Sequence, residues 1–137
     1  MSEFVWPVRV YYEDTDSGGV VYYANYLKFM ERARTEWLRS LGFEQDRLAE
    51  RAGVIFAVRS ATVEFISPAR FNDALEVSAQ VMQRRRASLT FKQGVYHAEQ
   101  PERALCSGLV RVACLSVVDF KPQAIPDFVV KEIVDVG

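Results

Sequence analysis

The chain has 137 residues, of which half are apolar and 26% are charged, with a formal net charge of −1. This length and composition predict one globular domain over residues 1–137. The small net charge gives no general attraction to nucleic acid or anionic membranes, and no apolar run approaches the ~20 residues of a membrane span. The N-terminus lacks a secretory signal pattern, so we expect a cytoplasmic protein.

The chain begins with a predicted strand and a polar loop. Residues 5–12 carry β-branched and aromatic side chains with one early proline, which favours a strand. Residues 13–19 hold three carboxylates, two hydroxyls and two glycines. Paired glycines let the backbone turn sharply and let a ligand approach it. The loop is therefore either an ordinary turn, or an acid placed beside a helix N-terminus for hydrolysis.

A long helix is predicted next, from Tyr22 or Ala24 to Leu41, with Gly42 as the residue that ends it. Arg34 falls inside its apolar arc, so this charge must either snorkel to solvent or meet a partner subunit. The apolar residues cover about half of the circumference, which is typical of a helix that lies across a sheet: Tyr26, Leu27, Phe29, Met30, Ala33, Trp37, Leu38 and Leu41.

The second strand is predicted over residues 55–66, after a shorter helical or irregular segment over 43–52 that Gly53 closes. Its apolar residues alternate, but Arg59 interrupts them, so we expect a bulge or a site there. The residues expected to share one face are Ala57, Ala61, Val63 and Phe65.

Three further strands are predicted around residues 75–81, 89–95 and 105–118, with a polar turn over 97–103 and a short helix over 127–134. One long helix followed by a run of strands is an α+β pattern.

The two cysteines and the single histidine point to no metal site. Cys106 and Cys114 share one predicted strand, about 26 Å apart at ~3.3 Å per residue, so we expect buried, reduced thiols. His97 lies in a polar turn without a fixed partner, which argues against a catalytic role. No spacing typical of metal ligands occurs.

The loop and the start of the helix carry a specific motif. It reads Tyr-Glu-Asp-Thr-Asp-x-Gly-Gly-Val-Val-Tyr-x-Ala-x-Tyr over residues 12–26 and runs into Glu-Arg-Ala-Arg-Thr-Glu over 31–36. The motif resembles the signature of hotdog-fold acyl-CoA thioesterases, and most of all the Tol–Pal-associated (YbgC-type) branch of the 4-hydroxybenzoyl-CoA thioesterase family. Residues 6–10, 62–65, 68–70 and 121–122 extend the resemblance. It implies a hotdog fold, in which an antiparallel sheet of about five strands wraps one long helix.

The resemblance implies two catalytic groups. Asp16 matches the family carboxylate, which acts as a general base on water or as a nucleophile on the thioester carbonyl. Tyr23 matches the position whose backbone N–H polarises that carbonyl. The branch commonly has His where this chain has Tyr23, whereas the 4-hydroxybenzoyl-CoA branch carries Tyr, so a backbone role fits. We interpret Asp14 as a residue that shapes the loop.

The resemblance also implies substrate contacts. Tyr12 lies near the site, where it either supports Asp16 or simply packs. Arg59, Ser60 and Ala61 fall where a facing strand passes the acyl group, although they are equally interpretable as ordinary strand residues. The full set of expected substrate-binding residues is Tyr12, Gly19, Val20, Tyr26, Arg59, Ser60 and Ala61.

The implied function is hydrolysis of an acyl-CoA thioester to free acid and CoA, with CoA as part of the substrate and no further cofactor. The alternative is a non-catalytic module that binds acyl thioesters or acyl carrier protein and is linked to the Tol–Pal envelope system. A hotdog hydratase is disfavoured because neither loop nor helix contains His. Residues 84–86, three arginines, are either solvated surface or a site for CoA phosphates or a carrier protein. The family implies a homodimer or homotetramer with active sites between subunits.

Overall fold

The computed structural model describes residues 3–133. Their elements, in chain order, are strand β1 (Phe4–Arg9), the 3-10 turn η1 (Tyr12–Asp14), helix α1 (Tyr23–Ser40), helix α2 (Gln45–Ala52), strands β2 (Val54–Phe65), β3 (Ala74–Arg85), β4 (Ser88–His97) and β5 (Gln100–Ser116), and helix α3 (Asp127–Val130).

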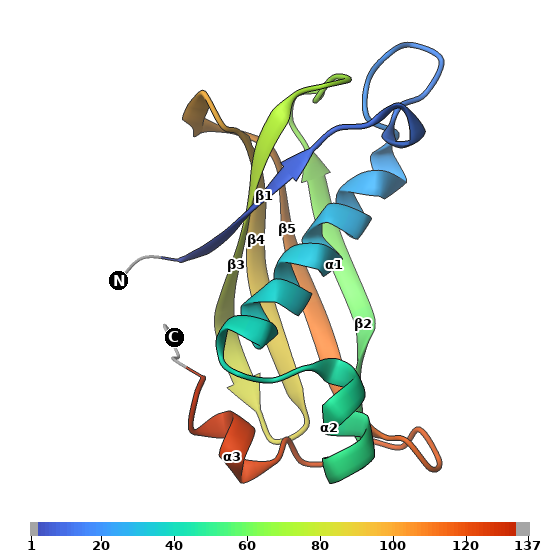
Figure 1. Ribbon diagram of the computed structural model, residues 1–137, viewed down its shortest axis with the longest axis vertical. Helices are drawn as coiled ribbons and strands as arrows, with labels where there is room; N and C mark the ends of the chain where they lie inside the picture. Colours follow the sequence, from blue (N-terminus) through green and yellow to red (C-terminus); the bar gives the residue numbers. More distant parts are fainter. Residues whose placement is uncertain (1–2, 134–137) are drawn as a thin grey trace.

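The five strands form one antiparallel sheet in the order β1-β3-β4-β5-β2. Helix α1 lies diagonally across one face of this sheet, so that its first turn is near the end of β2 and its last turn is near α2 (Figure 1). Strands β1 and β2 are the two edges. This arrangement confirms the predicted α+β fold of one long helix on a five-stranded antiparallel sheet.

Helix α1 ends as its sequence predicts. Gly42 has a φ of +98°, a left-handed conformation that favours glycine. Its N–H donates to the carbonyl of Arg39 (2.9 Å), and the N–H of Phe43 donates to that of Leu38 (3.2 Å). These two hydrogen bonds are those of a Schellman motif, which satisfies carbonyls that the helix leaves without partners.

The core lies between α1 and the sheet. From α1 it contains five apolar side chains exposed by 4% or less: Tyr26, Phe29, Met30, Ala33 and Leu38. Alternate residues of β3, β4 and β5 face them, as the period of a strand requires. Leu27, which we expected on this face, is 42% exposed instead, because it lies at the margin of the apolar arc.

Strand β2 contains the predicted bulge. Its pairing register with β5 shifts between Val58 and Ser60, which leaves Arg59 as the extra residue. The bulge reverses the alternation of the strand. Ala61 pairs with Val110, which faces the helix, whereas Ala57 pairs with Ala113 on the opposite face. The expectation that Ala57 and Ala61 share one face was therefore wrong.

Three other boundaries differ from the sequence prediction. Strand β1 ends at Arg9, because the chain then turns into η1. The expected polar turn over 97–103 is mostly strand, with β4 ending at His97 and β5 beginning at Gln100. Helix α3 stops at Val130, and position 134 of the expected helix lies outside the described residues.

The cysteines are free and buried, as predicted. Burial disfavours the thiolate, so it raises the pKa of Cys106 to about 12 and that of Cys114 to about 11. Both thiols are therefore neutral at physiological pH.

Candidate functional site

Residues 14–22 form a short antiparallel hairpin between η1 and α1, here called the Asp16 hairpin. At its tip Gly19 has a φ of +79°, which favours glycine. Asp16 is the last paired residue before the tip, and Tyr23 directly follows the returning arm. The hairpin thus brings the two predicted catalytic positions to one end of the molecule. Its rungs are the N–H of Tyr22 to the carbonyl of Asp14 (2.8 Å), the bridge between Thr15 and Val21, and the N–H of Asp16 to the carbonyl of Val20 (2.9 Å).

The Asp16 side chain is exposed to solvent, and its backbone is fixed in the hairpin. Its Oδ1 accepts a hydrogen bond from the N–H of Gly18 (2.8 Å). Within residues 3–133 its Oδ2 has no hydrogen-bond donor. The bond to Gly18 is the Asx-type interaction of an ordinary turn. It also restricts the direction of the carboxylate and leaves one oxygen open to a water molecule or a substrate.

The start of α1 offers backbone donors. No side chain caps this end, and the first N–H groups of a helix have no acceptor within the helix itself. In the described part of the chain the N–H of Tyr23 has no acceptor. The Tyr23 ring is 61% exposed and lies 4.8 Å from the Tyr22 ring. A hydrogen bond with Tyr23 raises the pKa of the Tyr22 phenol, so Tyr22 is neutral at pH 7.

Exposed aromatic side chains surround the hairpin. The Tyr12 ring stacks on that of Phe71, with centroids 3.9 Å apart, so this tyrosine packs against Phe71. Within residues 3–133 its side chain forms no hydrogen bond with Asp16. Tyr23 meets the edge of Phe65 at 6.1 Å. A hollow of about 240 Å³ lies beside these rings, lined by Val21, Tyr23, Tyr26, Phe65, Ile66, Ser67 and Pro68.

The loop after β2 holds the hairpin and α1 together. The carbonyl of Ala69 accepts the N–H of Val21 (2.8 Å), and the N–H of Ala69 donates to the hydroxyl of Tyr26 (2.9 Å). Burial raises the pKa of Tyr26, whose side chain is only 3% exposed. Val20 forms a bridge to Arg70, and the carbonyl of Gly19 accepts the N–H of Phe71 (3.4 Å). These anchors tie Gly19, Val20 and Tyr26 to the loop after β2, and Tyr26 lines the same hollow as Tyr23.

The remaining predicted contacts lie elsewhere in the chain. Arg59, Ser60 and Ala61 are exposed in the middle of β2. Phe65, which touches Tyr23, is six residues from Arg59, about 20 Å along a strand. One chain therefore does not bring residues 59–61 to Asp16. Arg84 and Arg85 end β3 and Arg86 follows in the turn; all three are exposed.

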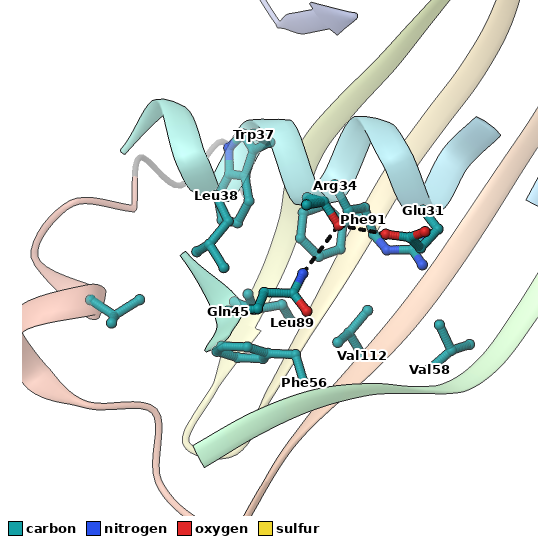
Figure 2. Close-up of a pocket in the computed structure, with 12 residues that line it drawn as sticks. Glu31, Arg34, Trp37, Leu38, Gln45, Phe56, Val58, Leu89, Phe91 and Val112 are labelled. Carbon is teal, nitrogen blue, oxygen red and sulfur yellow. Dashed lines mark hydrogen bonds between the residues drawn. The ribbon is translucent and has the colours of Figure 1, made fainter. Parts of the chain in front are cut away.

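A second, separate pocket lies under the C-terminal half of α1. Figure 2 shows it between α1 and α2 on one side and the sheet on the other. It has a volume of about 110 Å³ and neither Asp16 nor Tyr23 contributes to it. At its rim the hydroxyl of Thr35 donates to Glu31 (2.5 Å) and accepts from Gln45 (3.1 Å). Its walls are mostly apolar: Trp37, Leu38, Phe56, Val58, Leu89, Phe91, Val112 and Val129.

Arg34 also lines this pocket. Its place in the apolar arc of α1 left open whether the charge reaches solvent or meets a partner subunit. Its Nη1 donates to Oε1 of Gln93 (2.9 Å), and Nε2 of Gln93 donates to the carbonyls of Met30 (3.0 Å) and Ser78 (3.1 Å). Gln93 is 2% exposed. Burial lowers the pKa of Arg34, yet a guanidinium remains charged at pH 7. The arginine therefore turns into the core, where an amide is its partner.

Sequence reasoning missed three contributors to the site. Asn25 binds Asp14, Phe65 packs against Tyr23, and Phe71 packs against Tyr12. A signal existed for Asn25: it lies four residues before the buried Phe29, so a polar side chain falls on the apolar face of α1. The two phenylalanines gave no such signal, because their partners are more than forty residues away in the sequence.

Within residues 3–133 no helix is long and apolar enough to cross a membrane. The same residues contain no group of three or more His, Cys, Asp or Glu side chains placed to hold a metal ion.

Comparison with known proteins gives consistent matches. The sequence model of the Thioesterase superfamily (4HBT) matches residues 18–104. The chain is 49% identical over 130 residues to "Acyl-CoA thioester hydrolase YbgC" of Escherichia coli O6:H1, covering 94% of each protein. It is 42% identical over 123 residues to "Acyl-CoA thioesterase YbgC" of Haemophilus influenzae, covering 90% of this chain and 88% of the relative.

A solved structure matches as well. The crystal structure of a probable thioesterase from Bartonella henselae superposes with a TM-score of 0.83 at 32% identity, covering 91% of this chain and all of the other. The family match covers the Asp16 hairpin from Gly18 onward, helices α1 and α2, strands β2 to β4 and the start of β5. With its long helix on a five-stranded antiparallel sheet, the chain has the hotdog fold and belongs to the thioesterase superfamily.

Proposed function

We propose that this protein is an acyl-CoA thioesterase that hydrolyses its substrate to a free acid and CoA, with Asp16 and the N–H of Tyr23 as the catalytic pair. The observation that carries the proposal is the Asp16 hairpin, which joins an exposed carboxylate to the uncapped start of α1. The relatives that are 49% and 42% identical are named as an acyl-CoA thioester hydrolase and an acyl-CoA thioesterase.

The two groups have complementary tasks. The open oxygen of Asp16 either removes a proton from an attacking water or attacks the thioester carbonyl itself. Either route places negative charge on the carbonyl oxygen. The N–H of Tyr23, with the positive end of the α1 dipole behind it, stabilises that charge, and one such donor is worth about 3 kcal/mol of barrier. Tyr23 acts through its backbone, so the absence of His at this position removes nothing from the mechanism.

A homodimer joined along β2 would complete the site. Strand β2 has twelve residues, and within residues 3–133 no strand pairs with its outer side. Such an edge is a template for pairing with a second chain. Exposed apolar side chains flank it, among them Val58 (53% exposed) and Phe65 (49%). A tetramer of two such dimers is compatible with the same pairing.

Antiparallel pairing about the middle of β2 would place the Phe65 end of one strand beside the Val54 end of its partner. Phe65 touches Tyr23, whereas Phe56 and Val58 line the pocket under α1. The acyl group of a thioester held at Asp16 of one subunit would then enter the pocket of the other, passing residues 59–61. An apolar cavity of about 150 Å³ holds a benzene molecule, so a pocket of about 110 Å³ suits a short acyl tail.

The alternative is a non-catalytic module that binds acyl thioesters or acyl carrier protein within the Tol–Pal system. The exposed arginines 84–86 favour this alternative, because such a cluster would attract an acidic carrier protein. They lie at the opposite end of β3 from the loop that anchors the Asp16 hairpin, so a carrier bound there would not present its thioester to Asp16 of the same chain.

Release of free thiol from a panel of short, long and aromatic acyl-CoAs tests the proposal. Turnover of at least one member by the wild type, and its loss in Asp16→Asn, is the expected result. No turnover of any member, together with tight capture of acyl carrier protein, would favour the binding module instead.

A further inference from the structure

A buried pair of side chains closes the base of the Asp16 hairpin. Nδ2 of Asn25 donates to Oδ1 of Asp14 at 2.9 Å, and the two residues are 7% and 4% exposed. The other carboxylate oxygen, Oδ2 of Asp14, accepts the N–H of Tyr11 (2.9 Å). Both oxygens of Asp14 are thus occupied and shielded from water, which excludes this carboxylate as the group that activates a substrate.

In the sequence, Asp14 and Asn25 flank the two proposed catalytic positions. Asp14 precedes Asp16 by two residues, and Asn25 follows Tyr23 by two residues. Their hydrogen bond therefore links the outgoing arm of the hairpin to the first turn of α1. Backbone hydrogen bonds reinforce the link on both sides, from the N–H of Tyr22 to Asp14 and from the N–H of Asn25 to Tyr22, each 2.8 Å.

From this geometry we propose that Asp14 and Asn25 are positioning residues that fix the distance between the Asp16 carboxylate and the Tyr23 N–H. The inference rests on the proposed function, because it assigns that pair to catalysis. A displacement of about 1 Å between reacting groups can cost 10²-fold in rate. Without the buried bond, the arm that carries Asp16 loses this side-chain link to the first turn of α1, and backbone hydrogen bonds alone hold the two together.

A charge swap tests the positioning role. Asn25→Asp sets two carboxylates against each other in a buried space, which should push the hairpin away from α1. We expect kcat to fall about 10- to 100-fold on the best acyl-CoA, with KM changed by less than about threefold. Adding Asp14→Asn should restore kcat to within about threefold of wild type. The amide introduced at position 14 can donate to the carboxylate introduced at position 25, while its oxygen still accepts the N–H of Tyr11.

A second variant guards against misfolding of the charged one. Asn25→Leu removes the hydrogen bond without adding charge, and it should lower kcat about tenfold with KM little changed. Ser78→Ala is the matched control. It also removes a buried hydrogen bond, that from the N–H of Gly94 to the Ser78 hydroxyl (2.9 Å), but far from the hairpin. This control should lower Tm about as much as Asn25→Leu and leave kcat unchanged.

These measurements distinguish failure of the positioning role from failure of the proposed catalytic function. If Asn25→Leu and Asn25→Asp lower Tm but leave kcat of the folded protein at the wild-type value, while Asp16→Asn is inactive, the positioning role is wrong and the catalytic pair stands. Failure of the double variant to recover kcat although it regains wild-type Tm would also overturn the positioning role. If Asp16→Asn itself keeps full turnover, the proposed function fails, whatever the Asn25 variants do.

Discussion

The two ends of α1 are built in opposite ways. At the first turn Tyr23 is exposed, its backbone N–H is left open, and the hollow beside it is lined by side chains such as Tyr23, Phe65 and Ile66, which are 61%, 49% and 54% exposed. Under the second half of the helix the pocket is lined by apolar residues such as Leu89 and Phe91, each 2% exposed. One end has groups suited to chemistry and the other has a cavity suited to an apolar ligand.

In the proposed shared site, the catalytic groups come from one chain and the pocket from the other. The pocket lies under residues 31–38 of α1, and Arg34 follows Tyr23 by 11 residues, about 17 Å along the helix at 1.5 Å each. A second copy paired along β2 would bring the two kinds of end together, and the variants below test each end by itself.

The largest effect is expected at the Asp16 hairpin, which precedes the first turn of α1. Asp16→Asn keeps the size of the side chain and its bond from the N–H of Gly18, but removes the charge needed for base or nucleophile chemistry. We expect kcat for acyl-CoA hydrolysis to fall about 10³-fold. Glu13→Gln, which neutralises an exposed carboxylate in the same loop, is the matched control and should retain wild-type turnover. Equal losses in both variants would point to the net charge of the loop and not to Asp16.

Gln93, the buried amide that binds Arg34 under α1, should matter for stability and not for chemistry. Gln93→Leu removes the acceptor of Arg34 and the donor to two buried carbonyls, so we expect the free energy of unfolding to fall by about 3 kcal/mol. Urea unfolding at a fixed protein concentration measures this loss. Gln83→Leu, the same change at an exposed position of β3, should stay within about 0.5 kcal/mol of wild type. A similar loss in both would show that Arg34 does not depend on Gln93.

A smaller effect is expected at the tip of the hairpin. A Cβ on Gly18 would lie 3.2 Å from Oδ1 of Asp16, so Gly18→Ala must displace the carboxylate slightly. We expect kcat to fall about tenfold while Tm changes little. Gly42→Ala is the opposite control, because it strains a left-handed residue at the far end of α1 in open space, and it should lower stability by about 1 kcal/mol with kcat unchanged. Unchanged kcat in Gly18→Ala would mean that the direction of the Asp16 carboxylate does not limit turnover.

The smallest effect concerns the pocket. Val58 lines it and is 53% exposed, so Val58→Phe narrows the pocket with little strain in the core. We expect kcat/KM to fall several-fold for acyl chains long enough to reach the pocket, and to stay unchanged for acetyl-CoA. Val118→Phe, at a position 89% exposed and outside the pocket, is the control. An equal loss for acetyl-CoA and for longer substrates would show that the pocket does not receive the acyl tail.

The sequence predicted what local patterns determine. Helix α1 and its end at Gly42 follow from apolar periodicity and from one glycine, and the bulge at Arg59 follows from a charge inside a strand pattern. Contacts between distant residues were not predictable in this way. Asn25 and Asp14 are 11 positions apart and Arg34 and Gln93 are 59 apart, so only the folded chain shows that they bind each other. The change of face along β2 was missed because the prediction assumed that its side chains alternate strictly through the bulge at Arg59.

Mixed dimers decide whether the carboxylate of one subunit works with the pocket of the other. An Asp16→Asn subunit is combined with a Val58→Phe subunit, and thiol release is measured with an acyl-CoA that both homodimers turn over poorly. We expect about half of wild-type turnover per dimer, because one of the two sites combines the intact Asp16 with the intact pocket. Turnover no higher than the average of the two homodimers would rule out the shared site, since it would mean that each chain uses its own pocket.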